Sequence, residues 1–271
     1  MQRLAILFSV LFLALPAFAQ KPAKQTWPFA QGEELVYEGE FSRLLLRGVN
    51  VVDLRFAVVQ GPVQTTGEAA PPARSTFVFT ADASSKGALL KIFKQSFRQH
   101  FETTAEASTL VALTTKKEDI QNKRERLSDA VFDYAKGKLT WTERNPKDAN
   151  APPRVVASAL ESKAFDLVSV WYHLRLMPTF KSGASFILPI SDSGHVYQIP
   201  VRVGGRKTIK TALGRVPVVQ LAPDIFGDDK LIGGKGSLTI WLTDDARHIP
   251  VKGEISNEKG KLSLTLKSAK L

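Results

Sequence analysis

Two aspartates, an arginine and a histidine lie within five consecutive positions of the stretch "WLTDDARHIP", residues 241–250. A carboxylate and an imidazole, here Asp245 and His248, can act as a general acid–base pair when both side chains converge on one substrate. The stretch also lies between two strand-like segments, and aspartate is favoured in turns because its side chain bonds the local backbone. We therefore predict a turn over Asp244 to Arg247, with catalysis by Asp245 and His248 as the alternative.

A second polar set occurs in "FDLVSVWYHLRLMP", residues 165–178, the one segment with clear helical periodicity. Asp166, Ser169 and His173 fall on one polar stripe of the predicted helix. A nucleophilic serine is usually held on a strained turn beside an oxyanion hole, whereas Ser169 would lie within a regular helix. We therefore expect Asp166 to cap a helix over about 165–177 rather than to belong to a catalytic triad.

Arg175 is the residue of this helix best suited to binding. It shares a face with Trp171 and Tyr172, so its guanidinium would lie among large side chains and would need a partner. That partner is either an Asp or Glu of the protein or the acidic head of a ligand. We predict Trp171, Tyr172 and Arg175 as ligand-binding residues.

The other residues that could carry chemistry form no recognisable motif. The four histidines lie in separate segments without the paired spacing of zinc sites, and the chain has no cysteine. The stretch "GDDKLIGGKGS" lacks the leading glycine and the final Ser or Thr of a phosphate-binding loop. We therefore predict no catalytic residues, no metal site and no cofactor.

The first twenty residues, "MQRLAILFSVLFLALPAFAQ", combine an early positive charge, an apolar core, and small residues at Ala17 and Ala19. This pattern is typical of a secretory signal peptide, here cleaved after Ala19. The apolar core is shorter than the ~20 residues that span a bilayer, and no later stretch would span one. We predict export to the periplasm or cell surface, with residues 20–271 forming a single predominantly β domain.

The chain is basic, with a net charge of +11. A positive surface favours anionic partners such as lipid head groups or acidic polymers. The charges are spread along the chain and an exported protein rarely meets nucleic acid, so we expect no nucleic-acid partner. The most charged run, residues 116–126, is either a solvated strand face or an anion-binding edge.

Apolar residues alternate with polar ones along most of the remaining sequence. Stretches such as "ELVYEGEF", "SLTIWLT" and "KLSLTLKSAKL" show this period of two, which predicts consecutive antiparallel strands. In "VYQIPVRVGGRKTIKTALGRVPVVQL" we predict two strands joined by a turn at Gly204-Gly205. The predicted fold is mainly β, a curved antiparallel sheet or open β-barrel packed on the helix at about 165–177.

Several segments in order resemble one known family. They are "FAQGEELVYEGEF", "FDYAKGKLTW", "DLVSVWYHLR", "TALGRVPVVQLAP" and the closing "LTIWLTDDARHIPVKGEIS" with "GKLSLTLKSAKL". Together they resemble the bacterial exported family called domain of unknown function 3108, over about Pro28 to Leu271. The resemblance implies a periplasmic or surface location and a mostly β fold, and it implies no particular reaction.

A curved sheet leaves a concave apolar surface, and such concavities are the usual sites of ligands. The leading hypothesis is therefore an exported protein that binds a lipid or other amphiphile, with an acidic head near Arg175 or surface lysines. The alternative is a structural or assembly factor of the envelope that binds a protein or anionic polymer. An enzyme that uses Asp245 and His248 is the third hypothesis.

Overall fold

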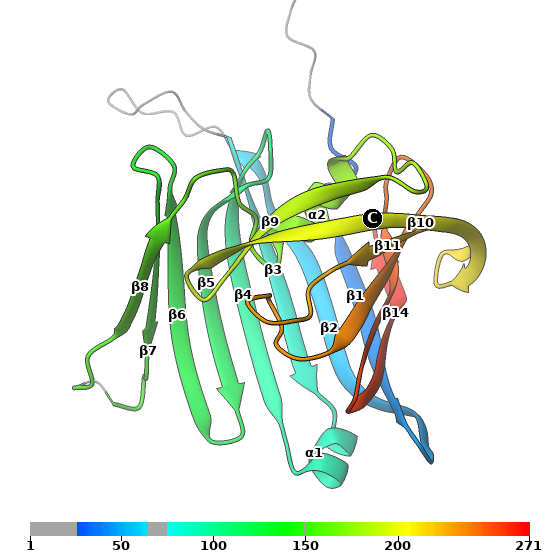
Figure 1. Ribbon diagram of the computed structural model, residues 1–271, viewed down its shortest axis with the longest axis horizontal. Helices are drawn as coiled ribbons and strands as arrows, with labels where there is room; N and C mark the ends of the chain where they lie inside the picture. Colours follow the sequence, from blue (N-terminus) through cyan, green and yellow to red (C-terminus); the bar gives the residue numbers. More distant parts are fainter. Residues whose placement is uncertain (1–25, 64–74, 149) are drawn as a thin grey trace, which may run out of the picture.

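The computed structural model describes residues 26–63, 75–148 and 150–271, so the predicted signal peptide and its cleavage site lie outside the described residues. The described chain forms fourteen strands and two short helices (Figure 1). In chain order these are β1 Glu34–Arg43, β2 Leu46–Val63, β3 Thr76–Ser85, α1 Gly87–Phe93, β4 Phe97–Glu106, β5 Ala112–Gln121, β6 Arg124–Asp133, β7 Lys138–Arg144, β8 Arg154–Ala159, α2 Ser169–Leu176, β9 Ser185–Asp192, β10 His195–Thr211, β11 Gly214–Pro223, β12 Gly236–Thr243, β13 Pro250–Asn257 and β14 Gly260–Lys270.

All fourteen strands belong to one antiparallel sheet, in the spatial order β8-β7-β6-β5-β4-β3-β2-β1-β14-β13-β12-β11-β10-β9. The first and last strands pair with each other, with Glu34 opposite Lys270, so the two halves of the chain run outwards from this central pair. The sheet curves strongly without closing, and the hydroxyl of Ser158 in β8 reaches the carbonyl of Gly194 beyond β9 at 2.8 Å. The prediction of a curved antiparallel sheet or open barrel is confirmed.

Successive side chains of each strand point to opposite faces of the sheet, and the apolar ones point to the concave interior. In β1, Leu35 and Tyr37 are buried, whereas the residues between them are only partly buried. Tyr37 lies opposite Leu54 of β2 on one side and Leu266 of β14 on the other. Directly opposite residues point to the same face of a sheet, so this register carries the apolar inner surface from strand to strand.

Helix α2 begins later than the sequence pattern predicts. The predicted helix covers about 165–177, but Phe165 forms a strand-like bridge to Ile190, and α2 starts only at Ser169. The reason is the side chain of Asp166, which accepts the backbone N–H groups of Val168 and Ser169. Asp166 therefore holds the turn that leads into the helix. The cap position itself is Val168, which makes no side-chain cap bond, so the expected cap at Asp166 lies two residues too early.

Helix α1 is an element that the sequence pattern does not predict. It spans only seven residues, and none of them is buried. A segment so short completes two turns, which is too little for a period of 3.6 to be recognised. The sheet packs on α2 as predicted, but the described chain contains this second helix as well.

The predicted turn at Gly204-Gly205 is wrong. Strand β10 continues through both glycines, and the chain reverses only after Thr211. The register between β10 and β11 shifts between Val203 and Arg206, so the two glycines form a bulge. Glycine suits a bulge as well as a turn, and the apolar alternation on both sides is compatible with either.

The two ends of the curved sheet differ in how their interiors are filled. Figure 1 shows α2 at one end and α1 at the other. Around α2, Tyr172 stacks on Phe79 at 3.9 Å and meets Phe29 edge-on, while Leu174 packs into a second cluster beneath β9 to β12. We call this the filled end, and we call the end that carries α1 and the β1–β2 turn the open end.

Candidate functional site

Residues 244–249 form the connection between β12 and β13, so the predicted turn over Asp244 to Arg247 is confirmed. One carboxylate oxygen of Asp245 accepts the hydroxyl of Thr243 at 2.7 Å and the backbone N–H of Arg247 at 3.0 Å. The other oxygen accepts the Arg247 guanidinium at 2.8 Å. Burial acts to raise the pKa of Asp245, but these bonds outweigh it and hold the pKa below its usual value.

His248 is part of the same turn. Its backbone lies in the left-handed region, with φ of 43°, and its N–H donates to the carbonyl of Asp245 at 3.2 Å. The imidazole is buried edge-on against Phe180, and burial lowers its pKa. The bond between Asp245 and His248 thus joins backbone atoms, which is the geometry of a turn.

The predicted polar stripe of Asp166, Ser169 and His173 forms hydrogen bonds that hold the start of α2 against the sheet. Asp166 is buried and accepts the hydroxyls of Thr103 and Thr115 in addition to the helix N–H groups. The oxygen of Ser169 accepts the N–H of Asp166, and His173 lies 3.2 Å from the carbonyl of Thr109. Asp166 and Ser169 each bond the backbone N–H of the other, and His173 lies at a different carbonyl, so their side chains do not form the chain of bonds of a triad.

Arg175 has a carboxylate partner within the protein. Its guanidinium forms a two-pronged ion pair with Glu33, the residue just before β1, and both side chains are almost completely buried. Nε donates to the carbonyl of Arg247 at 3.0 Å, and the second terminal nitrogen donates to the carbonyl of Pro28 at 2.7 Å. Of the two partners that the sequence allows, the structure contains the intramolecular one.

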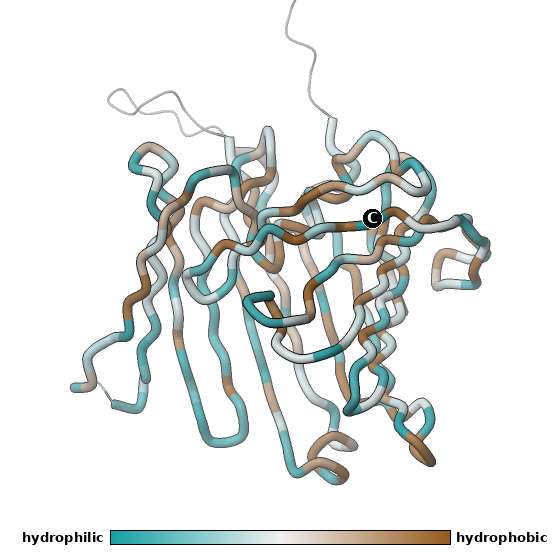
Figure 2. The backbone as a smooth tube through the Cα atoms, in the orientation of Figure 1, coloured by the Kyte–Doolittle hydropathy of each residue, from teal (hydrophilic) through white to brown (hydrophobic). Residues whose placement is uncertain are grey.

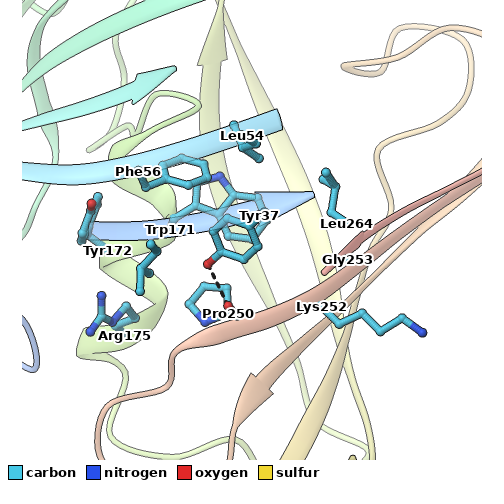
Figure 3. A pocket seen from close by; sticks show the side chains of 11 residues that line it. Tyr37, Leu54, Phe56, Trp171, Tyr172, Arg175, Pro250, Lys252, Gly253 and Leu264 are labelled. Carbon is cyan, nitrogen blue, oxygen red and sulfur yellow. Dashed lines mark hydrogen bonds between the residues drawn. The ribbon is translucent and has the colours of Figure 1, made fainter. Parts of the chain in front are cut away.

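The three residues predicted to bind a ligand line one pocket. Trp171, Tyr172 and Arg175 of α2 form one wall of it (Figure 3). The opposite wall consists of residues from β1, β2, β13 and β14: Leu35, Tyr37, Leu54, Phe56, Pro250, Lys252, Gly253 and Leu264. The sequence pattern does not single out these strand residues, because they come from both ends of the chain.

The pocket is narrow and largely apolar. Its volume is about 40 Å³. The hydroxyl of Tyr37 is bonded to the carbonyl of Pro250 at 2.7 Å and is therefore satisfied. The hydroxyl of Tyr172 is buried and has no hydrogen-bond partner among the described residues. Burial raises the pKa of Tyr172, so this phenol is neutral and able to donate.

A larger apolar groove adjoins the pocket towards the open end. It shares Leu54 and Leu264 with the pocket and has a volume of about 430 Å³. Side chains of several strands and of α1 line it, among them Phe41, Val52, Leu89, Phe97, Ile255 and Leu262. Pocket and groove together form an apolar track along the inner face of the central strands.

Towards the open end, the inner face of β4 to β7 carries polar and charged side chains, in contrast to this track. Gln99 of β4 donates to Asp119 of β5 at 3.0 Å, and Arg126 of β6 lies 3.8 Å from Glu143 of β7. Lys117 of β5 sits over the ring of Phe101, with 5.0 Å between its nitrogen and the ring centroid. The concave surface is therefore amphipathic, apolar on its central strands and charged on the part of β4 to β7 towards the open end. The part nearer α2 is apolar, with Phe132, Leu139 and Trp141 buried in one cluster.

Sequence comparison assigns the chain to a family. The family model described as a protein of unknown function, DUF3108, matches residues 47–267. The chain belongs to the DUF3108 family. The predicted resemblance is confirmed, although the match starts later than the expected Pro28. No curated protein matches this DUF3108 sequence.

Three solved structures resemble the DUF3108 chain. A β-barrel-like protein of the domain of unknown function DUF1849 from Brucella abortus has a TM-score of 0.53 and 11% identity, covering 89% of this chain and 98% of its own. At this identity the likeness shows the fold alone. A candidate exported protein with a YmcC-like fold from Bacteroides fragilis has a TM-score of 0.36 and 8% identity, with coverages of 90% and 98%. A candidate lipoprotein from Parabacteroides distasonis has a TM-score of 0.29 and 8% identity, with coverages of 90% and 97%.

The two helices of the described residues can be compared with the length that spans a bilayer. Neither helix in the described part of the DUF3108 chain is long and apolar enough to cross a bilayer.

Proposed function

We propose that this DUF3108 protein is exported and binds a lipid or other amphiphile on the concave face of its sheet. The observation that carries the proposal is the continuous apolar track of pocket and groove. The groove alone, at about 430 Å³, has the size of ordinary ligand sites, which span about 300–1,000 Å³. The pocket end of the track is lined by Trp171, Tyr172 and Arg175, the residues predicted to bind a ligand.

The amphipathic inner surface suggests how the ligand lies. Its apolar part would follow the track, and its acidic head would turn to the charged wall of β4 to β7. Arg175 is not the head-group site in this arrangement, because Glu33 already neutralises it. Lys117 is better placed, since it forms no ion pair with any described residue and covers the apolar ring of Phe101.

Tyr172 supports a ligand with a polar atom within the track. A buried hydroxyl without a partner costs about 1–3 kcal/mol, so native structures rarely leave one unpaired. An oxygen of the ligand, or a water beside it, would accept the Tyr172 proton and remove that cost. The proposal therefore favours an amphiphile with an ester or hydroxyl group over a pure hydrocarbon.

Native mass spectrometry of the protein purified gently from its own envelope tests the proposal. We expect adducts in the mass range of lipids that disappear when the same sample is denatured. The delipidated protein should then bind oleate in a titration. A clean mass for the freshly purified protein, together with no binding of oleate or phosphatidylglycerol, would refute the proposal.

The alternative, an envelope factor that binds a protein or polymer, is favoured by one feature. Strand β8 is an edge of the sheet, paired only with β7, and its Val155 is 56% exposed. Unpaired backbone groups on an edge can add a strand from a partner. Crosslinking in native envelopes that captures a specific protein at β8, in the absence of bound lipid, would support this alternative.

A further inference from the structure

The turn between β1 and β2 exposes three consecutive leucines. Leu44 is 88% exposed, Leu45 is 99% exposed and Leu46 is 37% exposed, and arginines 43 and 47 flank them. Figure 2 shows this turn as an apolar tip at the open end, projecting away from the rest of the molecule. Soluble proteins scatter single apolar residues over their surface, but a projecting cluster marks a contact site.

The geometry of the turn does not account for the leucines. Leu44 adopts φ of 48°, in the left-handed region that glycine and asparagine enter most easily. Arg43 pairs with Leu46, so Leu44 and Leu45 are the two residues of a tight hairpin turn. Because φ is positive at the first of them alone, the favoured sequence has glycine at that position. Leucine at these positions serves neither the turn nor the core, which points to a role outside the folded chain.

Helix α1 adds a second apolar element at the same end. It has no buried residue, and Leu90 is 50% exposed and Ile92 is 40% exposed. Its Phe93 packs edge-on against Phe41 of β1, with ring centroids 5.1 Å apart. This contact ties α1 to the β1–β2 hairpin, and both elements reach the open end in Figures 1 and 2.

Unpaired cations accompany the exposed apolar side chains. Arg43 and Arg47 flank the leucines, and Lys91 and Lys94 lie in and just after α1. None of these four side chains forms an ion pair with another described residue. The carboxylate of Glu40 lies on the neighbouring part of the hairpin, where it lines a hollow with both arginines. Cations still outnumber carboxylates here.

We infer that the open end docks on the surface of an anionic lipid bilayer. The side chains of Leu44 to Leu46, Leu90 and Ile92 enter the boundary between head groups and acyl chains. Arg43, Arg47 and the α1 lysines extend to the lipid phosphates. Apolar side chains ringed by long cationic ones suit this interface, because their apolar stems lie along the acyl region while their charges stay in water.

The docked orientation has a consequence for the groove. Leu89 of α1 and Phe41 of β1 line the groove at this end, so docking would bring the mouth of the groove to the membrane. The docking surface nevertheless does not rest on the proposed ligand site. A protein with an empty groove would still bind the bilayer through its leucines and cations.

Vesicle flotation tests the inference with the chain that lacks residues 1–19. Wild-type protein should float with vesicles of phosphatidylcholine and phosphatidylglycerol and not with phosphatidylcholine alone, and added salt should release it. Combining Leu44→Gly with Leu45→Asn should lower the bound-to-free ratio at least about tenfold, because it removes two inserted side chains. The same pair should keep or raise Tm, because it installs the preferred turn.

Charge and control variants complete the test. Arg43→Glu with Arg47→Glu should weaken binding more than fivefold per residue, since each lost cation alone accounts for roughly a fivefold change near an anionic surface. Val155→Thr with Ile187→Thr removes two exposed apolar residues elsewhere, at 56% and 61% exposure, and should leave binding unchanged. Equal binding of the leucine variant and wild type would overturn the inference. The inference would also be overturned if wild-type protein did not bind vesicles but self-associated through these leucines in sedimentation experiments.

Discussion

The same strands contribute to both ends of the sheet, but side chains pack closely at the filled end and leave a groove at the open end. At the filled end, Phe79 and Tyr172 stack with almost no exposure, and the buried pair of Arg175 and Glu33 connects α2 to the chain before β1. At the open end the same strands diverge around a groove of about 430 Å³, and α1 buries none of its residues.

The difference shows what determines where a curved sheet keeps a cavity. A concave sheet must be filled by something, because bare apolar surface is costly in water. Here the chain supplies α2 for one end, whereas at the other end α1 buries none of its residues and the apolar walls of the groove face open space. Stability should therefore reside mainly in the filled end and ligand contacts mainly in the open end.

The largest contrast should come from matched aromatic truncations. Phe79→Ala in the filled end should destabilise the protein by about 3–5 kcal/mol, because a fully buried ring leaves a cavity. Phe97→Ala, on the wall of the groove, should cost about 1 kcal/mol or less, because the ring is only partly buried and water replaces it. Urea unfolding of both variants measures the difference, and similar losses would contradict the distinction between the ends.

Breaking the ion pair of Glu33 should lower the free energy of unfolding much more than breaking the ion pair of its neighbour Glu34. Glu33→Gln leaves the buried Arg175 charge uncompensated and should lower the free energy of unfolding by about 3–5 kcal/mol. Glu34→Gln breaks a pair with Arg55 that is exposed to solvent, and it should cost about 1 kcal/mol or less. Chemical denaturation with both variants on the same day gives the comparison. A small loss for Glu33→Gln would mean that water reaches the filled end.

A smaller effect concerns pH. Burial lowers the pKa of His248 from 6.5, so the unfolded chain binds a proton at higher pH than the folded chain does. Stability should therefore fall as the pH drops from about 6.5 towards the lower pKa of the folded state. His248→Asn, which suits the left-handed backbone, should reduce this slope without removing it, because His173 is shifted in the same direction. An unchanged slope would show that His248 binds its proton equally well in the folded and unfolded chains.

Local patterns predicted the features of this fold that depend on local chemistry. Alternation at period two indicated the curved antiparallel sheet, and the aspartates of residues 241–250 indicated a turn. Asp166 was expected to cap the helix, and its side chain does bond two N–H groups before and at the start of α2, although α2 begins three residues later. Each of these features is determined by residues within a few positions of one another.

Features that join distant residues could not be predicted in this way. Glu33 meets Arg175 across 142 positions, and no local signal distinguishes it from its neighbour Glu34. The charged run 116–126 lies within the sheet, where Lys116 pairs with Glu102 and Arg124 lies 3.9 Å from Glu143. The sequence predicted the helix wall of the pocket, because that wall is one continuous segment. It did not predict the strand wall, because those residues come from both ends of the chain.

Gly253 offers a way to close the pocket without disturbing the sheet. It lies in β13 on the pocket wall, and a Cβ added there would meet only the Cβ of Leu264, at 3.9 Å. A side chain at this position should therefore enter the pocket. Gly205 is a matched control, because it is an exposed strand glycine with no atom within 4 Å of an added Cβ.

Titration of delipidated protein with oleate, for wild type, Gly253→Val and Gly205→Val, tests the account most directly. We predict that Gly253→Val weakens binding by at least about tenfold, which corresponds to about 1.4 kcal/mol, while its unfolding midpoint stays close to that of wild type. Gly205→Val should bind as wild type does. Equal affinities of all three folded proteins would contradict the claim that the track holds an apolar ligand.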